Sequence, residues 1–236
     1  MKRKVIFFDM GNTLLHFHNG DPDEVKDNFG IVLLTDYLKQ FCPTISVDEV
    51  KGGFYNVWMN KIDLRKVTLT EYPIESLLNE FLSTYQVQLT LKECIEAIDH
   101  FYTGYREQLY TEEFLRETLE ELRNRGYRLG VISNTCYFDE VMKHCFRVAN
   151  IFDLFETYTF SYEIGICKPR MEIFQAALSK MHVNPSDCIM VGDNNRVDLK
   201  PAIELGMKAI LLDRTNSQSD KEVMKINSIR EILKYL

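Results

Sequence analysis

A small set of charged and polar side chains in this sequence lies where short apolar segments end or where a helical pattern begins. These residues are Asp9, Ser133 with Asn134, Lys168, Asp193 and Asp198. Each alone has an ordinary explanation as a turn residue, a helix cap or a solvated lysine. The carboxyl ends of parallel strands meet at one edge of a sheet, so a single topology would bring all of them together. The pattern therefore predicts carboxylates, a hydroxyl and an ammonium gathered in one site.

Phosphoryl transfer through a covalent intermediate needs such a set, because it requires a nucleophile and groups that neutralise the phosphoryl oxygens. Asp9 is the predicted nucleophile, since it leads directly into a turn whose backbone N–H groups can face an anion. Ser133 and Lys168 are the other predicted catalytic residues, supplying a hydrogen bond and a positive charge. The predicted phosphate-binding residues are Gly11, Asn12, Ser133, Asn134 and Lys168.

The carboxylates also predict a metal ion. Asp9 and Asp193 offer the hard oxygen ligands that suit Mg²⁺, which usually takes one or two carboxylates, waters and a substrate phosphate. Without a cation these carboxylates would repel one another and an anionic substrate. Mg²⁺ is therefore the predicted cofactor.

The elements that must position these residues fall into two blocks. Residues 3–9 have the pattern of a buried strand, and from residue 111 onward short apolar strands alternate with helical segments. This alternation predicts βαβ units and a doubly wound, Rossmann-like parallel sheet in an α/β fold. Between the two lies a stretch with helical periodicity only, which includes a helix expected over 71–85 and the capping-box pairs Ser46 with Glu49 and Thr90 with Glu93. A further pair, Ser228 with Glu231, predicts a last helix, and residues 214–222 are expected to form a surface loop. We expect residues 1–19 and 107–236 to form the core and residues 20–106 a helical cap domain.

Four segments, "DMGNT", "SNT", "KPRMEIF" and "GDNNRVD", occur in the order of the four motifs of the haloacid dehalogenase-like (HAD) hydrolase superfamily, which this chain resembles. The resemblance implies that Asp9 is both the nucleophile and a metal ligand. It implies that Gly11 offers its backbone carbonyl to Mg²⁺, that Asp193 is the metal-binding acid, and that Asp198 supports it from behind. The insert after the first strand is similar to the family's α-helical C1 cap.

Gly11 departs from the family pattern. The family usually has a second aspartate here, which protonates the leaving group and later activates water, and such acid–base catalysis contributes about 10²–10⁴-fold. The glycine can still offer a backbone carbonyl, but it supplies no proton. His16, His18 and Lys51 are candidate substitutes, the histidines for their pKa and the lysine for its place beside a glycine pair. The histidines fit ordinary loop and flap positions better, and Lys51 fits a solvated helix face better.

The predicted function is a Mg²⁺-dependent phosphatase that acts on a small phosphorylated metabolite through an aspartyl-phosphate on Asp9. One alternative is a slow or inactive binding or regulatory module of the same fold, which Gly11 makes credible. A 2-haloacid dehalogenase is a less favoured alternative, and a phosphonatase with a Schiff-base lysine at position 51 is another.

Composition limits the partners. The formal net charge is −7 and the pI is near 5.3, which argues against nucleic acid or anionic lipid as a partner. No signal peptide or membrane span is recognisable, and the six scattered cysteines have no C-x-x-C pair, so we expect free thiols in the cytoplasm. The sequence does not decide between a monomer and a homodimer.

Overall fold

A six-stranded sheet forms the centre of the computed structural model, which describes residues 4–215 and 223–236. All paired strands run parallel in the order β3-β2-β1-β4-β5-β6, which confirms the predicted α/β class. The strands are β1 (Val5–Phe8), β2 (Arg128–Ser133), β3 (Thr157–Phe160), β4 (Cys188–Gly192), β5 (Lys208–Leu212) and β6 (Met224–Ile226). The chain builds outward from β1 on one side and then crosses to β4 on the other. The strand order therefore reverses beside β1, where sheets of this kind bind ligands.

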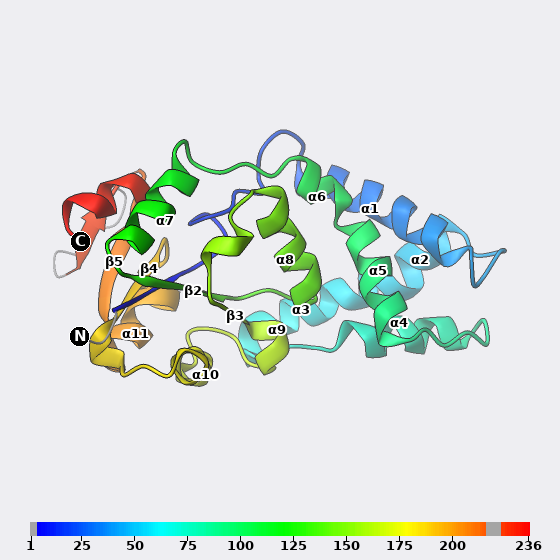
Figure 1. Cartoon of the computed structure of the whole chain (residues 1–236). Coiled ribbons are helices and arrows are strands. Elements are labelled where there is room, and N and C mark those ends of the chain that lie inside the picture. Colours follow the sequence, from blue (N-terminus) through cyan, green and yellow to red (C-terminus); the bar gives the residue numbers. More distant parts are fainter. Residues whose placement is uncertain (1–3, 216–222) are drawn as a thin grey trace.

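Both faces of the sheet are buried. Side chains alternate along a strand, so Ile6 and Phe8 pack into one apolar cluster while Val5 and Phe7 pack into another on the opposite face. Figure 1 shows α7 and α8 over one face and α10 and α11 over the other. The helices of the core are α7 (Leu115–Asn124), α8 (Asp139–Val148), α9 (Ser161–Ile164), α10 (Met171–Met181) and α11 (Lys200–Glu204). The continuous apolar runs of the strands reflect this double coverage.

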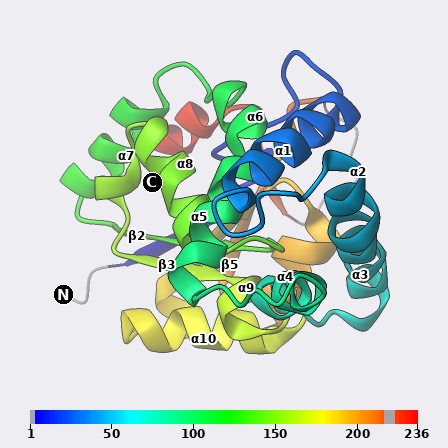
Figure 2. The same ribbon diagram turned by 90° about the vertical axis from the view of Figure 1, so that its right-hand side faces the viewer.

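Apart from isolated bridges, the regular elements of the described chain between β1 and α7 are helices. They are α1 (Asp23–Leu38), α2 (Val47–Val50), α3 (Asn56–Thr68), α4 (Ile74–Ser83), α5 (Leu91–Phe101) and α6 (Thr103–Glu107), with a π-helical turn at Lys51–Tyr55. Both predicted capping boxes are present, Ser46 with Glu49 at α2 and Thr90 with Glu93 at α5. Figure 1 shows the insert on one side of the molecule, and Figure 2 shows it from that side. Its assignment as a separate domain of the C1 type stays a prediction.

The insert and the sheet share one apolar cluster. Trp58 of α3 meets the ring of Tyr137, which follows β2, with ring centroids 5.3 Å apart. Tyr102, between α5 and α6, contacts the same ring at 4.5 Å. Helix α1 can lie close to α5 because Gly30 has no side chain there: a Cβ at this position would come within 2.4 Å of the Phe101 carbonyl oxygen. The insert is therefore anchored to the sheet layer by buried aromatic contacts.

Two predicted elements differ from the structure. The helix expected over 71–85 begins only at Ile74, because Thr70 pairs with Ile166 and the N–H of Glu71 donates to the Gly165 carbonyl. The last helix, expected with a capping box at Ser228, is a 3₁₀ helix over Ile229–Lys234 without a side-chain cap from Ser228, and the Glu231 carboxylate accepts from the Asn227 N–H instead. Strand β6 was not predicted, and most of the expected surface loop 214–222 lies outside the described residues.

No helix within residues 4–215 and 223–236 has the length and apolar content needed to cross a membrane.

Trp58 provides a test of the shared cluster. Because Trp58 is almost wholly buried between the insert and the sheet, we expect Trp58→Ala to lower the free energy of unfolding by about 3–5 kcal/mol, as measured by urea denaturation. Trp58→Phe should lose less, and Val67→Ala on the exposed side of the same helix should change little. A loss below about 1 kcal/mol for Trp58→Ala would contradict the proposed packing role.

Candidate active site

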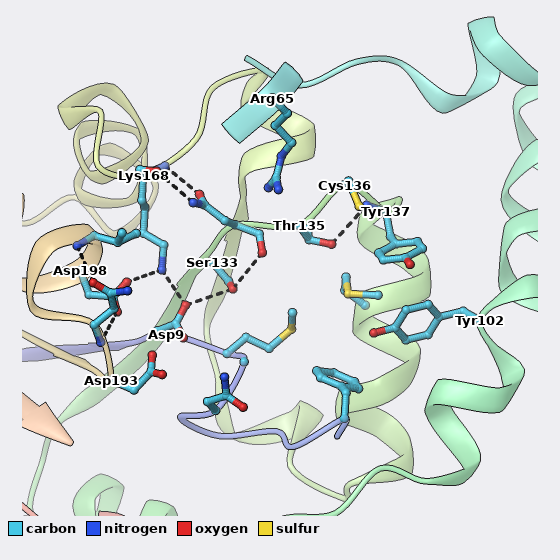
Figure 3. Close-up of a pocket in the computed structure, with 18 residues that line it drawn as sticks. Asp9, Arg65, Tyr102, Ser133, Thr135, Cys136, Tyr137, Lys168, Asp193 and Asp198 are labelled. Carbon is cyan, nitrogen blue, oxygen red and sulfur yellow. Dashed lines mark hydrogen bonds and ion pairs between the residues drawn. The ribbon is translucent and has the colours of Figure 1, made fainter. Parts of the chain in front are cut away.

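Asp9 lies at the carboxyl end of β1, buried beneath the insert. Its backbone N–H donates to the Val191 carbonyl at 2.9 Å, which places its side chain beyond the sheet edge. Its Oδ1 accepts hydrogen bonds from Lys168 Nζ at 2.6 Å and Ser133 Oγ at 3.1 Å (Figure 3). Its Oδ2 accepts one from Thr13 Oγ1 at 3.3 Å. The three residues predicted as catalytic are thus in direct contact.

Lys168 is buried, and its ammonium bridges two carboxylates. Nζ lies 2.6 Å from Oδ1 of Asp9 and 2.6 Å from Oδ1 of Asp198, and it also donates to the Ile132 carbonyl at 3.0 Å. Burial lowers the pKa of Lys168, but the carboxylates of Asp198 and Asp9 outweigh this effect and leave the pKa above its ordinary value. The lysine therefore stays a cation and holds the Asp9 carboxylate in one orientation.

Asn134 positions Lys168 rather than facing the cavity freely. Its Nδ2 donates to the Lys168 carbonyl at 3.0 Å, and its Oδ1 accepts from the Lys168 N–H at 2.7 Å. The nitrogen and the oxygen of the Asn134 side-chain amide therefore both bind the Lys168 backbone. Of the groups of Asn134, the backbone is left for the phosphate contact that the sequence predicts.

Both oxygens of Asp198 are also occupied. Oδ1 binds Lys168, and Oδ2 accepts a hydrogen bond from the N–H of Asn194 at 3.1 Å. Asp198 comes this close to β4 because Gly192 has no side chain, since a Cβ there would lie 2.6 Å from Asp198 Oδ2. This use of both oxygens suits the supporting role predicted for Asp198.

Asp9, Asp193 and Asp198 can bring ligand oxygens within 4.8 Å of one another. Burial, followed by the negative charge of Asp9, raises the pKa of Asp193 to about 6. A cation among these oxygens would offset both effects, and carboxylates are the ligands that Mg²⁺ favours. The residues present therefore fit a magnesium site.

The carboxylates and Lys168 open into a cavity of about 390 Å³. Gly11, Asn12 and Asn134, all predicted to bind phosphate, also line it. One wall is apolar and aromatic, and two of the lining residues, Arg65 and Tyr102, come from the helical insert. That wall consists of Met10, Phe17, Tyr102, Tyr137 and Met142. Tyr and Phe side chains of the insert are expected from the sequence to line the pocket, as Tyr102 does. The other residues of this wall and Arg65 were not predicted, because nothing in the local pattern marks them, and Thr13 had no assigned role within the first motif.

The predicted gap in acid–base chemistry at Gly11 is visible in the structure. Gly11 has no positive φ, and apart from its chain neighbours no heavy atom of residues 4–215 and 223–236 lies within 4 Å of the place a Cβ would take. None of the three substitutes considered lines the cavity: His16 stacks on Tyr110, His18 is exposed beside Asp23, and Lys51 donates to Asn28.

The phenols and the thiol that line the cavity are weak acids. Burial raises the pKa values of Tyr102 and Tyr137 well above their ordinary range, and it raises the pKa of the Cys136 thiol to about 12. Neither these phenols nor this thiol therefore stands in for the missing aspartate.

Comparison with known proteins agrees with this geometry. A family model described as haloacid dehalogenase-like hydrolase matches residues 3–206. The chain belongs to this hydrolase family. A glyceraldehyde 3-phosphate phosphatase from Methanocaldococcus jannaschii is 34% identical to it over 238 residues, spanning 98% of this chain and 95% of the relative.

Two further matches differ in extent. A glyceraldehyde 3-phosphate phosphatase from Methanothermobacter thermautotrophicus is 34% identical over 112 residues, and this match spans 48% of the chain and 49% of that relative. The crystal structure of an HAD phosphatase from Thermococcus onnurineus superposes with a TM-score of 0.59 at 21% identity, covering 98% of this chain and 97% of that one. This structural similarity, at 21% sequence identity, is evidence about the fold alone.

The raised pKa of Asp193 predicts how Asp193→Asn will behave. Above pH 6 the ionised side chain is disfavoured in the folded protein, so without metal we expect the variant to melt at a higher temperature than the wild type at pH 8. This gain should shrink as the pH falls from about 6 towards the ordinary aspartate value of 3.8. Mg²⁺ affinity, measured by calorimetry at pH 8, should fall at least about tenfold.

The matched control is Asp36→Asn, because Asp36 is exposed and pairs only with Lys39 among the described residues. Asp36→Asn should change neither the melting temperature nor the Mg²⁺ affinity. Unaltered Mg²⁺ affinity in Asp193→Asn would remove Asp193 from the metal site.

Proposed function

We propose that this protein is a Mg²⁺-dependent phosphatase that hydrolyses a small phosphorylated metabolite through an aspartyl-phosphate on Asp9. The observation that carries the proposal is the contact of Asp9 with both Lys168 and Ser133, beside Asp193 at the switch point of the sheet. Similarity to relatives named as phosphatases supports the same reaction.

In the proposed reaction an oxygen of Asp9 attacks phosphorus, and the bond from phosphorus to the leaving alcohol breaks. Lys168 and Ser133 hold the carboxylate in position and donate to the phosphoryl oxygens as charge moves onto them. Water then attacks the phosphorus of the aspartyl-phosphate, which releases inorganic phosphate and restores Asp9. Mg²⁺, held by Asp9, Asp193 and the Gly11 carbonyl, would neutralise the anionic phosphoryl group.

The proposed reaction lacks an obvious general acid to protonate the leaving alcohol. With glycine at position 11, and with the phenols and the thiol of the cavity too weakly acidic to replace an aspartate, alcohols that leave as basic alkoxides would depart slowly. We therefore propose that turnover depends strongly on the leaving group. The insert, which covers the cavity with Tyr102 and Arg65, would exclude water and select the substrate.

We further propose that the enzyme works in the cytoplasm on a small molecule, without nucleic acid or membrane as a partner. The acidic net charge and the six free cysteines support this setting.

The first test is a panel of phosphorylated metabolites, assayed for phosphate release with Mg²⁺ and again with a chelator. We expect hydrolysis of at least one compound, its loss with the chelator, and its loss in Asp9→Asn. Hydrolysis that Asp9→Asn retains would contradict the assignment of the nucleophile. Release of halide from a 2-haloacid that survives chelation would favour the dehalogenase alternative.

A slow binding or regulatory module is the second candidate, and Gly11 is the observation that favours it. Such a protein would form the aspartyl-phosphate but release it poorly. Phosphorylation of Asp9 that persists for minutes, measured by intact-protein mass spectrometry after exposure to a phosphate donor, would support the module over the enzyme.

The glycine itself gives a sharper prediction. Since the position is open and not at positive φ, Gly11→Asp should fold normally and place a carboxyl group near the leaving oxygen. We expect a gain in kcat of about tenfold or more on sugar-alcohol phosphates, whose alkoxides need a proton. The gain on p-nitrophenyl phosphate should be small, because nitrophenolate leaves unaided.

Gly11→Ala controls for the added Cβ and should leave the ratio of the two rates unchanged. If Gly11→Asp melts like the wild type, binds Mg²⁺ normally and gains nothing on alkyl phosphates, another group already supplies the proton.

A further inference from the structure

A second hollow, of about 490 Å³, adjoins the catalytic cavity. It runs along the boundary between the insert and the core, and it shares five lining residues with that cavity: Arg65, Asn134, Lys168, Asn194 and Val197. The cationic residues that line it are Arg65, Lys66, Lys168 and Arg196. None of the described residues that line it carries a carboxylate, although acidic residues outnumber basic ones by 35 to 28 in the chain.

Arg65 is held in a fixed position at the border of the two hollows. Its Nε lies 2.6 Å from Oε2 of the buried Glu71, and its Nη2 donates to Ser161 Oγ at 3.3 Å. Burial lowers the pKa of Arg65, but the Glu71 carboxylate and smaller contributions from Cys136 and Cys167 together raise it above its ordinary value. Figure 3 shows the guanidinium extending from α3 toward the cavity, between Lys168 and Thr135. The third guanidinium nitrogen of Arg65, Nη1, makes no hydrogen bond within the described residues.

Arg196 faces the same hollow from the core. It lies in the π-helical turn Asn195–Leu199 that follows β4, between the two acids of the fourth motif. Its backbone N–H is bound by the Asn194 side chain at 3.1 Å, which fixes the turn. Its guanidinium is exposed and has no ion pair within residues 4–215 and 223–236. Lys66 adds positive charge at the rim and pairs only with the exposed Asp63 among these residues.

We propose that this second hollow binds another anionic group of the substrate, with Arg65 of the insert and Arg196 of the core as its ligands. The substrate would then be a small phosphomonoester that also carries a carboxylate or a second phosphate. Guanidinium groups suit both anions because they present paired donors. The inference rests on the proposed function, since it places the reacting phosphoryl group at Asp9.

This arrangement makes substrate choice depend on both parts of the chain. One arginine comes from the insert and the other from the core, so a second anion would connect them across the boundary. The buried Glu71 neutralises part of the Arg65 charge but also removes its freedom, which lowers the entropy cost of binding.

Matched pairs of substrates test the proposal. Glycerol 3-phosphate and 3-phosphoglycerate differ by one carboxylate, and fructose 6-phosphate and fructose 1,6-bisphosphate differ by one phosphate. We expect the wild type, with Mg²⁺, to prefer the more anionic member of at least one pair by about tenfold or more in kcat/KM. Arg196→Gln should reduce this ratio several-fold.

Arg65→Lys is the second variant, because it keeps a cation beside Glu71 and loses only the planar donor pair; its melting temperature should be recorded to confirm folding. It should also reduce the ratio. Arg123→Gln removes one positive charge from α7, remote from the hollow, and controls for the overall field. The ratio should be unchanged in this control.

A wild-type ratio near one in both pairs, with p-nitrophenyl phosphate hydrolysed, would overturn the anion site and leave the phosphatase proposal standing. If no phosphomonoester is hydrolysed, the phosphatase proposal fails and calorimetry with 3-phosphoglycerate and fructose 1,6-bisphosphate decides about the hollow. At least tenfold tighter binding of either ligand by the wild type than by Arg196→Gln would support the site. Equal or undetectable binding of both would overturn it.

Discussion

The contact of the Lys168 ammonium with the carboxylates of Asp9 and Asp198 is the interaction on which the rest of the site depends. All three groups are buried, and buried charges are tolerated only when they are paired and hydrogen-bonded. Removing one partner from such a set typically costs about 3–5 kcal/mol, because another charge is left unpaired. The surrounding features serve this cluster: Asn134 fixes the backbone of Lys168, and Gly192 leaves room for Asp198.

The same cluster explains why the site needs further cations. One ammonium faces three carboxylates once Asp193 is included, and burial, followed by the negative charge of Asp9, raises the pKa of Asp193. An anionic substrate would be repelled unless positive charge is supplied locally. A divalent metal ion would supply it at the carboxylates, and the arginines of the adjoining hollow would supply it farther along the substrate.

The helical insert is part of this site and not only a cover over it. Arg65 and Tyr102 come from the insert, and Trp58 joins it to Tyr137 of the core through buried aromatic contact. Glu71 strengthens the connection, because Ser161 and Cys167 of the core both donate to its carboxylate. Any opening of the cavity must therefore break both apolar and polar contacts beside Lys168.

The sequence by itself determined the sheet, the helical insert and the residues at the strand ends. Those features depend on local periodicity and on the rule that parallel strands end at one edge, so Asp9, Ser133 and Asp193 could be placed before the fold was seen. The contacts of Arg65 with Glu71 and Ser161 were decided only by the tertiary structure, as was the use of Asn134 to hold Lys168. Arg65 and Ser161, like Asn134 and Lys168, are distant in sequence, and Arg65 meets Glu71 only because the chain turns back after α3. Such pairs leave no repeating pattern in the chain, because their geometry exists only once the insert has packed against the sheet.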